Sequence, residues 1–355
     1  MKNLLRRLSD WKHWPFLPFY FPISFVWLWY IIKSRAVWFF SISNPKLTFG
    51  GFEGESKEEM YSYLRKEFYP PTIYISPRKS FQEVISEVKE NSFSYPFIVK
   101  PNIGMEGILF RKIDSEAHLK TYHQQIPVDY IIQEFVNYPM EIGVFYYRIP
   151  GKKSGKISAF FLKKLPHITG DGISTIKELL RNSKTRIEEE TRKLLPENLE
   201  RILKKGEIFN LSFIGNRYHG STFHDLSKFI DPDLLQLFDK ISLTNNFYYG
   251  RYDIKCLSIQ DLKQGKNFSI LEFNGAGSIP NHIYTERYTL LEAYKEIIKH
   301  WRALYKVSHF NHKAGYSYWN FFKGYRFLMK AKKQIRLLKE CDKKIILKNQ
   351  PLVVN

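Results

Sequence analysis

The chain has 355 residues and a net charge of +20, because 55 Lys and Arg stand against 35 Asp and Glu. Hydrophobic residues at 44% and charged residues at 25% are ordinary for globular proteins, which excludes a disordered or fibrous chain. Two cysteines exclude a disulfide framework and a four-thiolate zinc site, so a reducing, cytoplasmic compartment is expected. A chain of this length is expected to form two or three domains.

The N-terminal region is unusually aromatic, with five of the seven tryptophans in the first 38 residues. Trp14–Ile32 is an uncharged run of 19 residues, long enough to resemble a membrane span. However, Pro15, Pro18 and Pro22 interrupt it, and the remaining Ile23–Ile32 is too short to cross a bilayer. Aromatic residues flanked by cations favour an in-plane anchor on the inner, anionic face of a cell membrane. The alternative is an arm that packs on the body or on a partner.

The middle of the chain is predicted to have mixed α/β architecture. Asn44–Lys57 is rich in Gly, Pro and Ser and is predicted to be a linker. After it, short helices and strands alternate, as mixed α/β proteins require. Helices are predicted over residues 58–67, 80–90, 115–125, 175–182, 184–204 and 233–243. Strands are predicted over 72–76, 97–101, 108–113 and 130–136, with hairpins 141–149/156–162 and 248–257/268–274.

The last 55 residues carry more than half of the net charge. From Trp301 to Asn355 there are thirteen Lys and Arg and two acidic residues. Apolar residues recur at three-, four- and seven-residue steps between Tyr318 and Ile345, which predicts a basic amphipathic helix. Such a helix can pack on the body, lie on an anionic membrane or contact nucleic acid. No nucleic-acid motif is present, so no specific nucleic acid is expected as a partner.

Two neighbouring segments place carboxylates at strand spacing. Residues two apart in a strand share a face, so Arg251 and Asp253 point together, as do Glu272 and Asn274. If the two strands pair, these side chains converge into a set of oxygen ligands that suits Mg²⁺, with Mn²⁺ as the alternative ion. Asp253, Glu272 and Asn274 are the predicted metal ligands, and Arg251 is positioned to meet phosphate oxygens. A surface charge pair on a hairpin is the other interpretation.

The segment YPFIVKPNIGMEG suggests a phosphate site. An apolar strand ends at Lys100 and continues into a loop with Gly104 and Gly107. Glycines let backbone N–H groups approach an anion, and a lysine at the strand end adds a positive charge.

Over residues 95–284, the order of these motifs resembles the ATP-grasp superfamily, including its D-alanine–D-alanine ligases. The resemblance implies an α/β (α+β) fold in which two lobes clasp ATP. It places Lys100 on the α- and β-phosphates, Gly104 to Gly107 over them, and Glu141 on the ribose hydroxyls. The segment IIQEFV is similar to the hinge between the lobes, which implies adenine contacts from Gln133, Glu134, Phe135 and Val136.

Further segments narrow the resemblance. RYDIK and LEFNGAGSIPNH are similar to R-x-D and E-x-N elements, which carries Arg251 onto the acyl-phosphate oxygen and the three predicted ligands onto magnesium. HITGDGISTIKELL resembles a segment of cyanophycin synthetases that follows a nucleotide-contacting lysine, and here either Lys163 or Lys164 takes that place. Ser278 stands where D-alanine ligases have a glycine, which disfavours D-alanine itself as the substrate.

The resemblance implies an ATP- and magnesium-dependent ligase that joins a carboxylate to an amine through an acyl phosphate. Amino-acid or peptide-like substrates are expected. A small-molecule kinase and a membrane-docked nucleotide-binding scaffold without turnover are the alternatives. His282 is the first candidate for the base that deprotonates the amine, followed by His219 and His224. The expected organisation is an arm over 1–57, a small lobe with hinge over 58–150, a large lobe over 151–310 and a basic helix and tail over 311–355.

Overall fold

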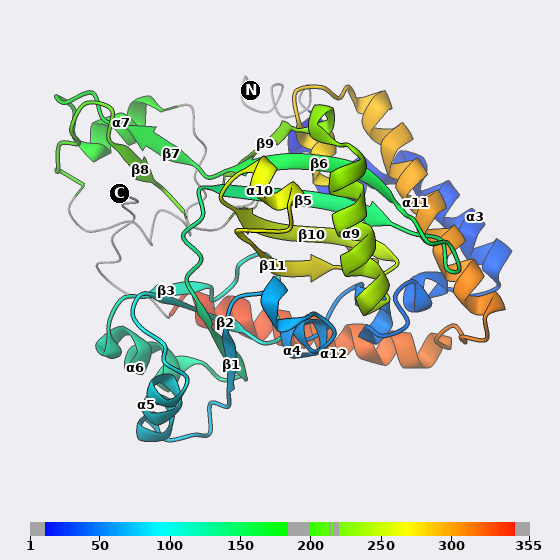
Figure 1. Cartoon of the computed structure of the whole chain (residues 1–355), viewed down its shortest axis with the longest axis horizontal. Helices are drawn as coiled ribbons and strands as arrows, with labels where there is room; N and C mark the ends of the chain where they lie inside the picture. Colours follow the sequence, from blue (N-terminus) through cyan, green and yellow to red (C-terminus); the bar gives the residue numbers. More distant parts are fainter. Residues whose placement is uncertain (1–10, 184–198, 213–214, 216–219, 345–355) are drawn as a thin grey trace.

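The computed structural model describes residues 11–183, 199–212, 215 and 220–344 and has two main antiparallel sheets, one in each lobe (Figure 1). The small-lobe sheet has the order β1-β4-β2-β3 and comprises β1 (Thr72–Ile75), β2 (Phe97–Pro101), β3 (Arg111–Ile113) and β4 (Tyr130–Glu134). The large-lobe sheet has the order β11-β10-β5-β6-β9 and comprises β5 (Met140–Tyr147), β6 (Lys156–Lys164), β9 (Thr222–Asp225), β10 (Tyr249–Cys256) and β11 (Phe268–Asn274). Both predicted hairpins are confirmed.

The small lobe is closed by two helices with strong start signals. Ser80 and Glu83 form a capping box that opens α5 (Phe81–Glu90), and Ser115 caps α6 (Glu116–Gln125). The buried faces of both helices share one apolar core with the sheet. The sheet ends at Glu134, so the change of lobe falls before β5 and not at residue 150 as expected.

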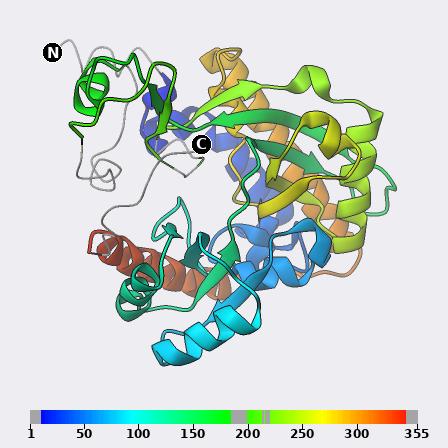
Figure 2. The ribbon, with the colours of Figure 1, turned by 60° about the vertical axis from the view of Figure 1, so that its left-hand side comes forward.

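The large-lobe sheet is covered on both faces. On one face, Tyr252 and Ile254 pack with α9 (Pro232–Asn245) and α10 (Ile259–Lys263). Alternate residues such as Phe145 and Tyr249 form a core on the other face with α11 (Leu290–Lys313) and the N-terminal region. A small outlying unit contains β7 (His167–Thr169), β8 (Ile208–Asn210) and α7 (Ile176–Asn182) (Figure 2). Most of the helix predicted over 184–204 lies outside the described residues.

The N-terminal region is part of the large lobe and not a separate arm. It contains α2 (Phe16–Tyr20), η2 (Phe21–Ile23), α3 (Ser24–Ser34), η3 (Phe39–Ile42) and η4 (Thr48–Gly51), after a short η1 (Trp11–His13). Phe39, Phe40 and Phe49 are almost fully buried in the core beneath α11. Aromatic side chains can bury large areas, so a sequence that is rich in them can form a core without regular strands.

The predicted linker is also a structured part of the fold. Asn44 is fully buried, and its side chain accepts hydrogen bonds from the backbone N–H groups of Tyr248 and Tyr249 at 2.8 and 3.1 Å. Its amide donates to the carbonyl oxygen of Tyr249 at 2.8 Å. The linker prediction is wrong because Gly, Pro and Ser here form tight turns against β10 rather than a solvated chain. The segment then enters α4 (Lys57–Ser62) and η5 (Lys66–Phe68).

The C-terminal helix α12 (Phe321–Asp342) runs along both lobes (Figure 1). At its start, Trp38 Nε1 donates to the carbonyl oxygen of Phe321 at 3.1 Å. Near its end, Leu338 is buried in the small-lobe core, and Asp342 pairs with Arg111 at 2.8 Å. The predicted helix is therefore present, and it packs on the body.

Candidate active site

The two strands that carry the predicted ligands pair as expected. In the antiparallel register of β10 and β11, Asp253 lies directly opposite Glu272, and Arg251 lies opposite Asn274. Opposed residues on one face of a sheet have Cβ atoms about 4.5–5.5 Å apart, which brings both carboxylates to one place. The sequence prediction that these four side chains converge is confirmed.

Asp253 is the centre of a buried ionic group that we call the Asp253 cluster: Glu141, Lys163, Arg251 and Asp253. Arg251 donates to both carboxylate oxygens through Nε at 2.8 Å and Nη2 at 2.9 Å. Lys163 Nζ lies 3.1 Å from Asp253 Oδ1 and 3.1 Å from Glu141 Oε1. Burial alone would raise the pKa of Asp253, but Arg251 and Lys163 lower it to about 2. The carboxylate is therefore ionised at neutral pH.

A glycine on β5, the strand between β10 and β6, leaves room for an aromatic ring next to this cluster. Gly143 of β5 stands opposite Asp253 in the register, and a Cβ added there would lie 2.2 Å from the ring of Phe161. Lys163 reaches Asp253 across this position from β6, while the neighbouring Lys164 is exposed. The structure thus brings Lys163, and not Lys164, to the site.

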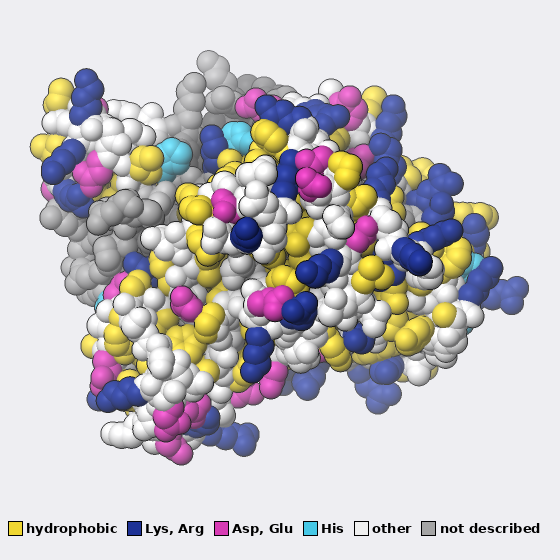
Figure 3. Space-filling model, in the orientation of Figure 1, with side chains coloured by type: hydrophobic (Ala, Val, Ile, Leu, Met, Phe, Trp, Pro, Cys, Tyr) yellow, Lys and Arg dark blue, Asp and Glu magenta, His cyan; other side chains and the backbone are white. Residues whose placement is uncertain are grey.

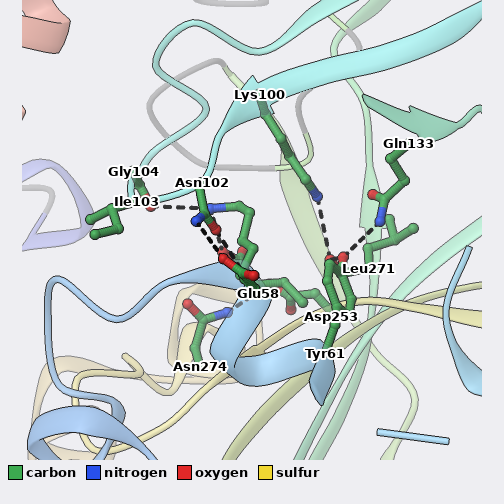
Figure 4. A network of polar contacts seen from close by, with 12 residues as sticks. Glu58, Tyr61, Lys100, Asn102, Ile103, Gly104, Gln133, Asp253, Leu271 and Asn274 are labelled. Carbon is green, nitrogen blue, oxygen red and sulfur yellow. Dashed lines mark hydrogen bonds and ion pairs between the residues drawn. The ribbon is translucent and has the colours of Figure 1, made fainter. Parts of the chain in front are cut away.

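Two more lysines reach this place: Lys100 from the small lobe (Figure 4), and Lys57 from α4, whose buried residues pack in the large-lobe core. Lys100 Nζ donates to the carbonyl oxygen of Leu271 on β11 at 3.4 Å. Its burial and the nearby Lys57 lower its pKa to about 7. Lys57, at the start of α4, lies 3.8 Å from Glu272 Oε1 and donates to the carbonyl oxygen of Gly104 at 3.4 Å. Four cations, Lys57, Lys100, Lys163 and Arg251, therefore gather around the opposed carboxylates, as a polyanionic ligand requires.

Sequence reasoning did not commit to Lys57, and it missed the segment before it. Gly51 and Gly275 approach closely, because a Cβ added to Gly51 would lie 3.0 Å from the Cα of Gly275. This contact places Glu55 near Glu272. Burial and that neighbouring carboxylate raise the pKa of Glu55 to about 7. The available signal was a Gly-Gly turn followed by spaced charged residues, which was assigned to a linker.

The glycine loop after Lys100 has left-handed backbone at Glu106 and Gly107. Gly107 has a φ of 79°, in the left-handed region that glycine adopts without strain. Gln334 of α12 donates to the carbonyl oxygen of Ile103 at 3.4 Å, and Lys339 lies 3.6 Å from Glu106. Gly104 packs near Leu338 of the same helix. The loop that is predicted to cover phosphates is therefore held from outside by α12.

The predicted adenine-binding segment lies at the change of lobe. Gln133 is buried, and its amide donates to Tyr61 at 2.9 Å and Thr72 at 2.8 Å, so its side chain supports the small lobe. Lys255 Nζ donates to the carbonyl oxygen of Val136 at 3.1 Å and lies 5.4 Å from the ring centre of Phe135. Glu134 is exposed. Adenine contacts from Gln133 to Val136 and ribose contacts from Glu141 stay predictions.

The three candidate bases lie apart from one another. His282 is buried beside Glu296 and His300, and none of its described contacts joins it to the Asp253 cluster. His224 is exposed on β9, and His219 lies outside the described residues. The assignment of His282 as the base stays a prediction that this placement does not favour.

The residues fit a hard divalent cation. Asp253 and Glu272 offer carboxylate oxygens, and Asn274 donates through Nδ2 to Asp253 at 3.3 Å, which leaves its Oδ1 as an acceptor. Oxygen donors of this kind are those that Mg²⁺ prefers, together with substrate phosphates. Asp253 is also bonded to Arg251 and Lys163, so the cations and a metal share one carboxylate.

Comparisons with known proteins find likeness in structure only. No family model and no curated protein matches the sequence. A bifunctional glutathione synthetase from Pasteurella multocida has a TM-score of 0.37 and 13% identity, over 68% of this chain and 36% of that one. A D-Ala:D-Ser ligase from Enterococcus faecalis has a TM-score of 0.42 and 13% identity, over 70% and 61% of the two chains. The ATP-grasp ligase PsnB, complexed with a minimal precursor, has a TM-score of 0.37 and 12% identity, over 69% and 60%.

The match spans less than two thirds of each of these three proteins. Since all three TM-scores lie below 0.5, the fold assignment depends on the topology and the converging site described above. Two antiparallel sheets face each other across Lys100 on one side and the paired carboxylates of Asp253 and Glu272 on the other. The structure has the two-lobed, mixed α/β architecture that the sequence motifs predicted.

Proposed function

We propose that the protein is an ATP- and Mg²⁺-dependent ligase that joins a carboxylate to an amine. The observation that carries this proposal is the convergence of Asp253 and Glu272 of the large lobe with Lys100 of the small lobe and with Lys57 at the start of α4. Cations of both lobes would screen the phosphates of ATP. Asp253, Glu272 and Asn274 would hold the metal ion, which neutralises charge on the triphosphate when bound.

The proposed reaction has two steps. A carboxylate oxygen of the substrate attacks the γ-phosphorus, and the bond to the β–γ bridging oxygen breaks, giving an acyl phosphate and ADP. The amine nitrogen then attacks the acyl carbon and loses a proton, and phosphate leaves with the bonding electron pair. Arg251 is fixed by Asp253 and by its own Nη1 bond to the carbonyl oxygen of Ile279 at 3.0 Å. A preorganised donor of this kind stabilises the oxyanion that forms on the acyl group.

Product analysis tests this proposal. ATP and Mg²⁺ are incubated with the protein and pooled amino acids and short peptides, and ADP, phosphate and new amides are measured. Ligation gives ADP and phosphate in equal amounts together with an amide. ADP with a phosphorylated substrate would instead indicate a kinase, and ATP binding without ADP would indicate a scaffold. Unchanged turnover in both Asp253→Ala and Glu272→Ala would contradict the metal assignment.

We also propose that the ligase works on the inner face of the cell membrane. Seven large apolar side chains of the N-terminal helices are more than half exposed: Phe16, Leu17, Phe21, Phe25, Leu28, Trp29 and Ile32. Within α3, Phe25, Leu28, Trp29 and Ile32 are spaced so that they lie on one face of the helix. On the opposite face, the ring of Tyr30 stacks on that of Tyr305 of α11, with 4.7 Å between the ring centres. Exposed apolar patches of this kind on a folded protein are typical of interaction sites.

The surroundings favour an anionic surface. Phe321, Phe322 and Tyr325 are also exposed at the start of α12, which Trp38 joins to the end of the N-terminal segment. Lys33 and Arg35 at the end of α3 and Lys323 and Arg326 of α12 are exposed, and Lys and Arg side chains gather along the edge near α3 and α11 in Figure 3. Charge and exposed aromatics together favour attachment to anionic lipid headgroups.

By length and composition alone, Phe16–Ser34 could cross a membrane. Phe19 and Ile23, however, are buried against α11, so a helix crossing the bilayer would have to leave that core. An in-plane attachment keeps these contacts.

Flotation with vesicles containing phosphatidylserine tests the attachment. The triple variant Phe21→Ser, Phe25→Ser, Trp29→Ser is expected to lose binding, because its three side chains project from the body. The matched control is Ile173→Ser with Ile208→Ser, which removes exposed apolar side chains from the outlying unit. Equal flotation of the triple variant and the wild type would contradict the proposed surface.

A further inference from the structure

A second buried group of titratable side chains lies outside the proposed active site. We call it the His300 cluster: His282 of η7 (Asn281–Tyr284) with Glu296 and His300 of α11. Both histidines are 3% exposed. One ligand atom from each of the three residues can be chosen so that all lie within 4.8 Å of one another. The residues come from two elements, and Glu296 and His300 share a helix face because they are four residues apart.

The polar atoms of this cluster are not satisfied by hydrogen bonds. Among the residues that the structure describes, none gives a hydrogen-bond partner to either ring nitrogen of His282 or His300. Glu296 Oε1 lies 3.6 Å from Nε2 of His282 and 3.5 Å from Nε2 of His300, longer than ordinary N–H···O bonds. Buried polar groups in native proteins nearly always have a partner, so unpaired nitrogens on both rings require an explanation.

The same distances match the edges of a metal coordination tetrahedron. With zinc–nitrogen and zinc–oxygen bonds of about 2.0–2.2 Å, tetrahedral ligand atoms lie roughly 3.3–3.6 Å apart. Both measured N···O separations fall in or at the limit of this range. Two imidazoles and one carboxylate are also an established type of zinc ligand set, with a fourth position for water.

The chemistry of the three side chains suits a cation. Zn²⁺ binds neutral imidazole nitrogens and ionised carboxylate oxygens, and this cluster offers both kinds of ligand. The side chain of Glu296 is 13% exposed, which gives the cluster one edge toward solvent.

We propose that His282, Glu296 and His300 bind a Zn²⁺ ion through two imidazole nitrogens and one carboxylate oxygen, with a fourth position for water. This site is distinct from the predicted Mg²⁺ site, whose ligands are all oxygens. The ion would tie η7 to α11. Three residues before His282, the carbonyl oxygen of Ile279 accepts the hydrogen bond from Arg251. The Zn²⁺ site would therefore fix the loop that positions the proposed oxyanion-stabilising arginine.

Metal binding to the full-length, untagged protein tests this proposal. The protein is stripped with EDTA, returned to Mg²⁺ buffer and titrated with Co²⁺, whose visible absorption reports tetrahedral coordination, and then with Zn²⁺. The wild type is expected to bind one Co²⁺ with a tetrahedral spectrum that one Zn²⁺ displaces. His282→Gln and His300→Gln are expected to lose the spectrum. His309→Gln, which changes a partly buried histidine of the same helix outside the cluster, is the matched control and should retain it.

Folding is checked without activity measurements. Circular dichroism of the stripped proteins shows whether each variant is folded, and Glu296→Gln provides a variant of nearly unchanged shape. Zn²⁺ should raise the melting temperature of the wild type and of His309→Gln, but not that of Glu296→Gln. A wild type that binds neither ion in a saturable one-to-one manner would overturn the proposal. Equal one-to-one binding by the wild type and His300→Gln would also overturn it.

Discussion

The Asp253 cluster and the His300 cluster are both buried and ionisable, yet they are stabilised differently. In the Asp253 cluster, two carboxylates meet two cations at 2.8–3.1 Å. In the His300 cluster, one carboxylate stands 3.5–3.6 Å from two rings whose nitrogens have no hydrogen-bond partner. In the first, the carboxylates already have cationic partners within the chain, and the proposed Mg²⁺ ion would share them. In the second, the ring nitrogens have no hydrogen-bond partner among the described residues, so a metal ion would supply the partner that they lack.

The largest expected effect concerns the first cluster. Asp253→Ala leaves Arg251 and Lys163 buried without their shared carboxylate, which typically costs about 3–5 kcal/mol. ATP turnover should fall by about 100-fold or more, because Arg251 loses its fixed position. Urea unfolding and ADP release measure the two effects. Asp233→Ala, which changes an exposed residue of α9, is the control. Similar losses of stability and turnover in both variants would contradict a specific role of the Asp253 cluster.

The next effect concerns the support behind the Asp253 cluster. Asn44→Ala removes a buried side chain that bonds to the backbone at the start of β10, and each group left unpaired costs about 1–3 kcal/mol. The free energy of unfolding should therefore fall by about 2 kcal/mol or more. Asn91→Ala removes an exposed amide that water can replace, so it should have little effect. Equal unfolding curves for the two variants would mean that the segment before α4 does not support β10.

A third prediction uses the depressed pKa of Lys100. In the folded protein it is about 7, against 10.5 for a free lysine, so the unfolded chain binds more protons between these values. Stability should therefore rise as the pH is raised from about 7 to about 10, and Lys100→Met should flatten this slope. The unfolding free energies of the wild type and the variant, determined at several pH values in this range, measure the slope. Lys66→Met, which changes an exposed lysine, is the control. An unchanged slope in Lys100→Met would assign the pH dependence to other groups.

The smallest effect on stability is expected for the His300 cluster in the metal-free protein. In EDTA, His300→Leu removes two nitrogens that have no hydrogen-bond partner and keeps most of the volume, so the unfolding free energy should change by less than about 1.5 kcal/mol. His309→Leu is the control on the same helix. A loss as large as that of Asp253→Ala would mean that internal polar contacts, and not a missing ion, stabilise the His300 cluster.

The core of the active site could be predicted because it depends on local rules. Strand alternation fixes which side chains of RYDIK and LEFN share a face, and a short connection makes their pairing the simplest arrangement. The helix starts predicted at Ser80 and Thr175 are also retained, and the structure shows a capping box at each. The choice between Lys163 and Lys164 depended on strand register, which the sequence did not settle.

The missed features depend on contacts between distant segments. Lys57 and Glu55 enter the site only because the turn at Gly51 packs against Gly275, which lies more than 200 residues later. The burial of Phe39 and Phe49 depends on α11 in the same way. The His300 cluster combines a helix with a loop whose path the sequence pattern does not fix. From composition alone, these segments were predicted to be a linker and a separate arm. The residues that they pack against lie far away in the sequence, so no local pattern indicates the contacts.

Helix α12 has a mechanical consequence. It is secured at its first turn to Trp38 of the large lobe and near its last turn to Arg111 and the core of the small lobe. A continuous helix of 22 residues resists bending, so it acts as a brace between the two halves that would grip a nucleotide. Any widening of the gap between them has to release one of its two attachments, and the patch proposed to touch lipid lies beside the first.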